Sequence, residues 1–524
     1  MASGDQDATR ADADRPTQIG SRQIVTVLCM TVGTWAYAYT WNSVGVALPH
    51  MQGAFSATTD QITWVMIAFV IGGAMATAST GWLSAQFGRK RLYLAAIAGY
   101  TVTLLGCGLS TTLTEEVFWR FVQGVTGAPL LPLGQAIAVN AFPAGRHGQA
   151  TSLWALGFVT GNVVAPTLSG HLIDQHGWPW IFYVNVPIGI AVFIAAWFLV
   201  PRSEKAPRPL DWLGFTSLIV GVGALQLMLA RGERLDWFAS TEIVVEAAIA
   251  ATALYVFIAH TLTARKSFVD KSLFLDRNFG LGLFFIFLVG AVFYLPLLLL
   301  PLLLQQIGGY PAVETGNLLL ARGVGSIIGL MIMSQIRDRY DPRPILLIGL
   351  LLAAIPAWSM AHWTVDVRPI DVVVANFVQG IAAGAIWAPL NILTLSRLDR
   401  RVQDQGFALF YLNFDAGYAI GAAGIIALHA RHSQINHAVL NEAINPYNEL
   451  LRYARPSELW DIAEASGLTA LDAEITRQAT MIAYNNSFLV SALVICALIP
   501  LILLFRHRAP TAAPQAPAAP PSGN

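Results

Sequence analysis

The chain has 524 residues, of which 55% are hydrophobic and only 12% are charged, and its 31 basic and 31 acidic residues cancel. Soluble proteins usually carry about 25% charged residues, so the composition excludes a disordered chain and an ordinary cytosolic enzyme. The zero net charge argues against a nucleic-acid partner, which normally requires a basic surplus. A polytopic membrane protein remains, provided that the apolar residues form spans of about 20.

Apolar runs between polar breaks predict fourteen membrane-spanning helices. They cover 22–49, 61–82, 91–112, 115–140, 148–172, 180–200, 211–230, 241–262, 279–304, 314–336, 344–363, 371–395, 405–429 and 484–505. Residues 1–20 are polar and 509–524 are rich in proline and alanine, which predicts disordered tails. The N-terminal tail lacks a basic stretch followed by an apolar one, so we expect no cleavable signal sequence.

The distribution of lysine and arginine over the connections predicts the orientation of the helices. Of the 31 basic residues, 22 fall in the tails and the even-numbered connections, whereas 7 fall in the odd-numbered ones. Cytoplasmic loops carry the excess of lysine and arginine, so both termini are predicted to be cytoplasmic. The long connection 430–483 then lies outside, where Pro456–Glu464 and Leu471–Met481 suggest short amphipathic helices of a cap or docking element.

A short internal repeat indicates two related halves. Phe121-Val122-Gln123-Gly124 recurs as Phe377-Val378-Gln379-Gly380, early in the fourth and the twelfth helix. Parallel repeats related by an axis along the membrane normal are typical of one class of transporters. We therefore expect a six-helix half over 21–200, two accessory helices over 201–278 and a second half over 279–508.

Further motifs follow in order along the chain. They are Val46-Ala-Leu-Pro49, Gly81-Trp-Leu-Ser-Ala-Gln-Phe-Gly-Arg-Lys90, Arg120-x-x-Gln123-Gly124, Gly157-x-x-x-Gly161 with Pro166, Trp178-Pro-Trp-Ile-Phe-Tyr-Val-Asn-Val-Pro-Ile-Gly189, Gln305-x-x-x-Gly309-Tyr310 and Ala321-Arg-Gly-Val-Gly325. Over about residues 22–506 the chain resembles the fourteen-span drug:proton antiporters of the major facilitator superfamily, of the EmrB/QacA type. The resemblance implies an all-α major facilitator fold and a proton-coupled exporter of drugs or other amphiphilic compounds, which confers resistance from the bacterial inner membrane.

The sequence departs from this family where members often carry acids. Thr40 and Ala85 replace the usual Asp of the first helix and of the inner-loop motif, and Asn162 replaces a proline in the fifth helix. Proton coupling must then use other residues. In the family, the aspartate of the inner-loop motif forms a latch between helices at the cytoplasmic face, and we expect this latch to be weaker here. For the remaining motif residues the resemblance implies roles in conformational change. The alternative for the glycines is ordinary small-residue packing, and the alternative for the basic loop is that it only sets the orientation of the helices in the membrane. These residues are Gly81, Gly88, Arg89, Lys90, Gly124, Gly157, Gly161, Pro166 and Gly170.

Four ionisable side chains fall at membrane depth, where a charge costs about 2.5–3.5 kcal/mol and marks a functional candidate. We assign proton coupling to Asp415, Arg120 and Arg322. Asp415 lies near mid-membrane among small residues, and its alternatives are a structural pair with Arg322 or a backbone donor. Arg120 could instead form a fixed ion pair or extend to the interface, and Arg322 could bind an anionic group. Glu246 is expected to reach the interface by snorkelling.

A binding site for the transported compound is expected centrally, between the halves. Aromatic walls with a few polar groups suit flat or amphiphilic molecules, although each aromatic side chain could instead face lipid or pack. The candidates are Trp35, Tyr39, Asn42, Gln123, Trp154, Asn162, Trp387, Asn391, Tyr411 and Asn413.

The sequence leaves other functions open. A major facilitator with another cargo or direction, such as an organic-anion exporter or a solute:proton symporter, fits the missing acid at Thr40, and a non-transporting sensor is a further alternative. An enzyme is disfavoured, because the chain has no nucleotide, metalloprotease or hydrolase motif. We expect no cofactor and no metal. By analogy, the long outer connection suggests a periplasmic adaptor and an outer-membrane channel as partners.

Overall fold

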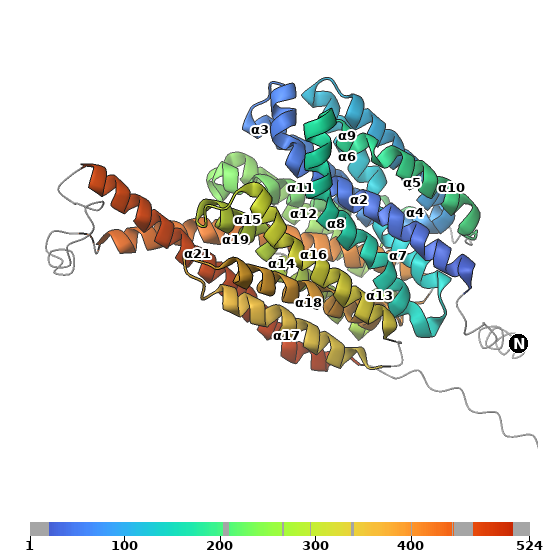
Figure 1. The fold of residues 1–524 in the computed structure, drawn as a ribbon. Helices are drawn as coiled ribbons and strands as arrows, with labels where there is room; N and C mark the ends of the chain where they lie inside the picture. The colour runs from blue at the N-terminus through green and yellow to red at the C-terminus, as the bar shows by residue number, and fades with distance from the viewer. Residues whose placement is uncertain are drawn as a thin grey trace, which may run out of the picture.

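In a computed structural model, residues 20–506 are described except 203–208, 265–266, 294, 337–339, 400, 443 and 445–464. The described residues form helices and connections, without strands. The predicted tails, except for Gly20, and the predicted helix Pro456–Glu464 lie outside this description. Every one of the fourteen predicted segments is helical, and the helices are shown in Figure 1.

The first half contains eight α-helices besides the short α3. They are α2 (Ser21–Ala54), α4 (Trp64–Phe87), α5 (Arg89–Leu109), α6 (Leu113–Gly127), α7 (Leu130–Ala141), α8 (His147–His176), α9 (Trp180–Tyr183) and α10 (Asn185–Leu199). The fourth predicted helix is divided between α6 and α7 at Pro129, whose ring cannot donate a backbone hydrogen bond. The short α3 (Thr59–Ile62) precedes α4.

The accessory pair and the second half follow. The accessory helices are α11 (Trp212–Arg231) and α12 (Thr241–Thr263). The second half has α13 (Ser272–Leu275), α14 (Arg277–Phe293), α15 (Leu295–Gln306), α16 (Ala312–Gln335), α17 (Pro342–Met360), α18 (Pro369–Leu395), α19 (Gln403–Glu442) and α21 (Ala465–Leu501). Twelve spans of the described chain are long and apolar enough to cross a membrane. The helices α2 and α8 fall outside that set, although they have 34 and 30 residues.

Two apolar cores lie mainly in one half each, and both extend into the other half through α4 and α7 or through α16 and α19. One continuous core joins α2, α4, α5, α7 and α8, and a second joins α14 to α21 with the accessory helices. The halves meet along two seams, α4 against α19 and α8 against α16. The helix α11 packs on both α4 and α19, so the accessory pair flanks the first seam.

Two helices extend far beyond the bundle, which corrects the prediction of a loop over 430–483. The helix α19 continues to Glu442 and α21 begins at Ala465, so Leu471–Met481 is the middle of a long helix and not a short separate one. At 1.5 Å per residue, the 40 residues of α19 span about 60 Å, twice the apolar core of a bilayer. The projecting parts, 430–442 and 465–483, form what we call the stalk (Figure 1).

Glu246 is also placed differently from its prediction. Its carboxylate does not extend to the interface but forms an ion pair with Arg231, at 2.7 Å, between α12 and α11. The same guanidinium contacts Glu242. These pairs hold the outer ends of the two accessory helices together, so Glu246 has a structural explanation.

Two of the motif glycines of α8 lie in close contact with α2, whereas a third does not. Gly157 of α8 packs directly on the backbone of Thr31 in α2, and Gly161 lies against Trp35 and Tyr39 of the same helix. A side chain at Gly170 would meet no atom within 4 Å. Of these three glycines, only the first two allow the close packing of α8 on α2.

We expect Gly157→Val to separate α2 from α8 and to destabilise the protein by roughly 1–3 kcal/mol, the usual cost of overpacking. The thermal unfolding of the purified protein in detergent measures this effect. The matched substitution Gly170→Val, on the same helix but in open space, should leave the transition unchanged. Equal destabilisation by both changes would contradict the assignment of close packing to Gly157.

Candidate functional site

One end of the molecule joins the halves through polar contacts. We call it the inner face; it contains the end of α4 and the starts of α5 and α19. Arg89 forms an ion pair with Asp404 at 2.5 Å, and Ser84 donates a hydrogen bond to the same carboxylate. Asn140, at the end of α7, donates to Gln403 at 3.0 Å. These contacts close the seam between α4 and α19.

The inner contact differs from what the loop motif alone suggests. The motif lacks its usual acid at Ala85, but an acid is supplied by the opposite half, as Asp404 at the start of α19. Gly81 allows the approach, since a side chain there would collide with the backbone of Gln405 at 2.7 Å. The inner face thus has an acid–base contact that the loop motif alone does not show, while the predicted weakening of the latch stays a prediction. Lys90 turns elsewhere and donates to the Trp197 carbonyl within the first half, at 2.6 Å.

A second set of contacts joins the halves at mid-depth. Gln135 of α7 donates to Asn391 of α18 at 2.8 Å and accepts from the Tyr411 hydroxyl of α19 at 2.6 Å. The ring of Tyr411 lies 6.1 Å from that of Trp154 and 5.9 Å from that of Trp387. The indole nitrogens of both tryptophans are buried and have no hydrogen-bond partner among the described residues. We call these five residues the central cluster.

Four members of the central cluster were predicted, and Gln135 was not. The repeat contains a signal that could have found it. Gln135 and Asn391 each stand eleven residues after the glycine of the repeat, Gly124 and Gly380. They are equivalent positions of the two halves and meet across the interface.

Asp415 lies one helical turn from Tyr411 on the same face of α19, away from the inner face. Its carboxylate is partly accessible and forms no hydrogen bond or ion pair with any described residue. The alternative of a pair with Arg322 is therefore excluded. Gly417 and Gly421 lie on the other side of α19 and pack on the backbone of α14, so Asp415 is left turned toward the interface of the halves.

Further candidates line α2 and α8 at the depth of Asp415 or beyond. Trp35 stacks on Tyr39 with ring centroids 5.3 Å apart, and Ser169 donates to the Tyr39 hydroxyl at 3.1 Å. Asn42 donates to Asn162, which connects α2 to α8. Trp35, Asn42 and Asn162 are partly accessible. Asn413 donates to the Leu409 carbonyl of its own helix and lies off this wall.

Each half buries one arginine, although the two do not stand at equivalent positions of the repeat: Arg120 is on α6 and Arg322 is on α16. Arg120 donates to the Val65 carbonyl at 3.2 Å and to Gln123, and lies over the ring of Phe69 at 4.1 Å. Arg322 donates to Gln379 at 2.8 Å and to the Phe293 carbonyl at 2.9 Å, and lies over the Phe293 ring at 5.0 Å. The repeat thus provides one glutamine acceptor for each arginine.

These contacts place Gln123 and both arginines inside the bundles and not at the interface of the halves. Gln123 has no exposed surface, and Arg120 and Arg322 are 1% and 7% exposed. Gly124 packs on the Phe69 backbone beside them, as Gly380 does on Arg322. We therefore separate them from the central cluster and from Asp415.

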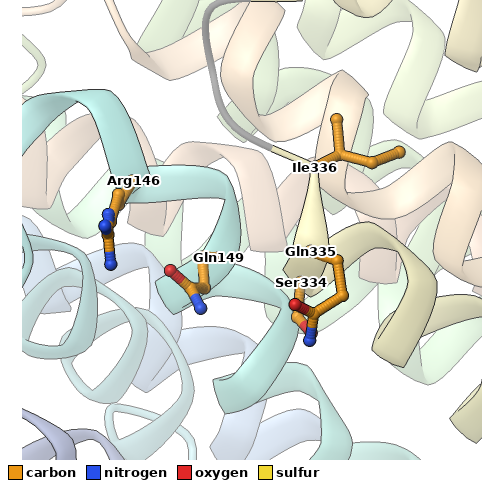
Figure 2. A pocket seen from close by; sticks show the side chains of 5 residues that line it. All are labelled: Arg146, Gln149, Ser334, Gln335 and Ile336. Atoms are coloured by element: carbon orange, nitrogen blue, oxygen red, sulfur yellow. The ribbon is translucent and has the colours of Figure 1, made fainter.

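The second seam is open at its inner end. A polar crevice of about 170 Å³ lies between the start of α8 and the end of α16. Arg146 and Gln149 line one wall, and Ser334, Gln335 and Ile336 line the other (Figure 2). Farther from the inner face, Gly323 of α16 packs directly on Val163 of α8. The inner face is thus closed along the α4–α19 seam and has a polar crevice along the α8–α16 seam.

The sequence model of the Major Facilitator Superfamily matches residues 30–422. The chain belongs to the Major Facilitator Superfamily. As a major facilitator it is a multi-pass membrane protein, and its α4–α19 and α8–α16 seams join the two halves that the repeat predicts. The predicted family and the all-α fold are thereby confirmed.

Individual major facilitators resemble the chain over most of its length. It is 30% identical to the multidrug export protein EmrB of Haemophilus influenzae, over 90% of this chain and 94% of that protein. It is 31% identical to the fatty acid resistance protein FarB of Neisseria gonorrhoeae, over 88% and 91%. The solved structure of the proton:xylose symporter XylE has a TM-score of 0.58 at 14% identity, over 92% of this chain and 97% of that one, which shows the fold alone.

Proposed function

We propose that the protein exports drugs or other amphiphilic organic compounds across the bacterial inner membrane in exchange for protons. The observation that carries the proposal is the Asp415 carboxylate, unpaired and partly accessible beside the aromatic central cluster. A carboxylate held among apolar helices can take up and release a proton, and when charged it attracts a cationic cargo. Similarity to multidrug export proteins supports the same function.

The proposed cycle alternates access to Asp415 from the two sides. The charge bias assigns the inner face to the cytoplasm, so the Arg89–Asp404 contact closes the cytoplasmic side in this structure. In this state Asp415 takes up a proton from outside. Protonation removes the charge that holds a cargo, and rocking of the halves then exposes the site inward, where cargo replaces the proton.

The bound cargo would contact one aromatic wall from each half. Trp154 and Trp387 supply the flat surfaces and two unpartnered N–H donors, and Tyr411 lies between them. Trp35 and Asn42 extend the wall on α2. Few fixed polar groups and several rings suit cargoes that share an amphiphilic shape and not one functional group.

Organic-anion export through Arg322 is less well supported. The guanidinium already donates to Gln379 and Phe293 and is buried inside the second half. FarB, a relative, is named for fatty acid resistance, so amphiphilic anions belong in any test of cargo.

Susceptibility of a host lacking its own exporters, with and without this chain, tests the function. The panel contains amphiphilic cations, neutral compounds and fatty acids, and the compound with the largest shift becomes the cargo for purified protein in lipid vesicles. An imposed pH gradient should drive its transport, with protons moving the opposite way. Transport that ignores the pH gradient would contradict the antiport.

The stalk is the basis for a proposed partner, a periplasmic adaptor that leads to an outer-membrane channel. Ile435 and Val439 lie one turn apart on the stalk part of α19 and are 47% and 59% exposed, and Leu468 of α21 is 48% exposed. Apolar side chains at i and i+4 on a projecting helix offer a stripe to a partner helix.

Replacing Ile435 and Val439 with aspartate should abolish association with an adaptor from the same membrane, as measured by in-cell crosslinking of the two proteins. The neighbouring exposed positions Gln434 and Ala438 provide the matched control, since aspartates there change charge but leave the apolar stripe intact. Export in whole cells should fall with the first pair, while transport in vesicles is retained. Unchanged crosslinking with the first pair would contradict this partner site.

A further inference from the structure

A fifth ionisable residue lies inside the membrane region, beyond the four predicted from the sequence. Glu116 is in the first turn of α6, and its side chain is 0% exposed. Glu116 is the second residue of the predicted helix 115–140, so the sequence alone suggests that it belongs to the connection and not to the membrane-spanning part. Its neighbour Glu115 is exposed and caps the helix, with Oε2 accepting from the Thr111 N–H at 2.9 Å.

The hydrogen bonds of Glu116 suit a carboxyl that exchanges a proton. The Ser110 hydroxyl lies 2.8 Å from Glu116 Oε2 and 2.9 Å from the Cys107 carbonyl oxygen, but it has only one proton to donate. A charged Glu116 accepts the hydrogen bond of the Ser110 hydroxyl, so the Cys107 carbonyl loses that donor. A protonated Glu116 can donate to Ser110 Oγ, which then donates to the carbonyl. Glu116 Oε1 is buried without a partner among the described residues.

A buried cation stands on the next turn of the same helix. Arg120 is fully enclosed and forms no ion pair within the described residues; its donors go to Gln123 and the Val65 carbonyl. The Cys107 thiol lies 3.9 Å from the same oxygen of Gln123. Glu116 is an acid on the Arg120 face of α6, so its charged form is stabilised by the guanidinium and its neutral form leaves that charge uncompensated.

This polar group connects outer water to the centre of the molecule. Ser110 is partly exposed in the connection between α5 and α6, on the predicted outer side. On the other side, the Phe69 ring under Arg120 lies 5.7 Å from that of Tyr37. The groups Glu116, Arg120, Phe69 and Tyr37 thus follow one another from the outer connection toward the interior of the first half.

We propose that Glu116 is a second proton-binding carboxyl of this transporter, loaded from the outer side through Ser110. The inference rests on the proposed proton-coupled export and adds a site in the first half to Asp415 in the second. Thr40, where related sequences carry an acid, accepts from Asn185 at 3.3 Å and donates to Ala36, so that position is neutral. The helices α4, α5 and α7 pack on α6. The titratable groups facing the site are Arg120 of α6, Tyr100 and Cys107 of α5, and Tyr37 of α2, with none from α4 or α7.

The test compares Glu116→Gln with the matched control Glu115→Gln in lipid vesicles, using the cargo selected in the susceptibility panel. Two rates are measured: transport driven by a pH gradient, and exchange of labelled for unlabelled cargo at equal pH. Glu116→Gln should lose the first rate and retain the second, whereas Glu115→Gln should retain both. Retention of both rates by Glu116→Gln, or loss of both by correctly folded protein, would overturn the assignment.

The unmodified protein supplies a second measurement that does not depend on the folding of a variant. A protonated buried carboxyl gives its proton to a hydrophobic carbodiimide and then adds to the carbodiimide carbon, so peptide mass spectrometry should find label on Glu116, decreasing as the pH rises, and none on Glu115. Absence of label on Glu116 at every pH would overturn the inference. If wild-type protein exchanges cargo but moves no protons, the proposed antiport fails, and that result is distinct from a failure of Glu116 alone.

Discussion

Asp415→Asn should reduce transport driven by a pH gradient to the level of protein-free vesicles, while exchange of cargo at equal pH continues. The amide matches the carboxylate in size but binds no proton at physiological pH, so the step that consumes the gradient is lost and the packing is kept. Since Asp415 has no hydrogen bond or ion pair to a described residue, the change breaks no contact of the fold. The two rates, measured on one preparation, separate coupling from binding.

The matched control is Asp371→Asn, an acid at the outer end of α18. Asp371 pairs with Arg368 at 2.9 Å, and the Arg368 side chain is 75% exposed, so solvent screens the pair and its loss should matter little to the fold. This variant should transport like wild type. If Asp415→Asn retains full proton-linked transport, another carboxyl couples protons to transport and our assignment is wrong. If both variants lose transport, the loss does not depend on the position of the substituted acid.

Reversing the charge of Arg89 should open the inner face. In Arg89→Asp two acids meet at Asp404, where the wild-type side chains are each only 17% exposed. Loss of such a mostly buried pair should cost roughly 1–3 kcal/mol, which is a shift of about 5- to 150-fold between conformations. The double variant Arg89→Asp/Asp404→Arg restores the attraction with the charges exchanged, and should recover most of the closed population.

Labelling from the cytoplasmic side measures that population. A cysteine at position 403 lies under the inner closure, since Gln403 is 8% exposed, and it is introduced into a chain without Cys29, Cys107 and Cys496. A water-soluble thiol reagent should label it quickly in Arg89→Asp and slowly in the parent and in the double variant. Equal labelling rates in all three proteins would show that the ion pair does not hold this face closed.

The helices and the halves could be predicted because their physical causes are local. A bilayer requires about 20 apolar residues per span, and the two glutamines of the repeat mark equivalent positions, so the pattern is visible in the sequence. Both glutamines accept from a buried arginine, Arg120 or Arg322. Four of the five residues of the central cluster were among the candidates because they are aromatic or amide side chains within apolar helices, although other candidates of the same kind, such as Gln123 and Asn413, lie elsewhere.

Contacts between distant segments could not be predicted. The acid opposite Arg89 lies more than three hundred residues away, as Asp404, and only the folded interface brings the two together. The stalk was missed because its helices are polar and lack the apolar run that marks a span. Glu116 looks like a loop acid in the sequence, and its burial comes from Ser110, Cys107 and α4 packing around it.

The length of α19 has a mechanical consequence. One unbroken helix carries the gate acid Asp404, the cluster residue Tyr411, the unpaired Asp415 and the exposed Val439. From Tyr411 to its end at Glu442 the helix is a rigid arm of roughly 45 Å. If α19 tilts by a few degrees about a point near Tyr411, its end at Glu442 moves by several ångströms. A protein bound to the stalk would therefore be moved whenever the inner gate opens.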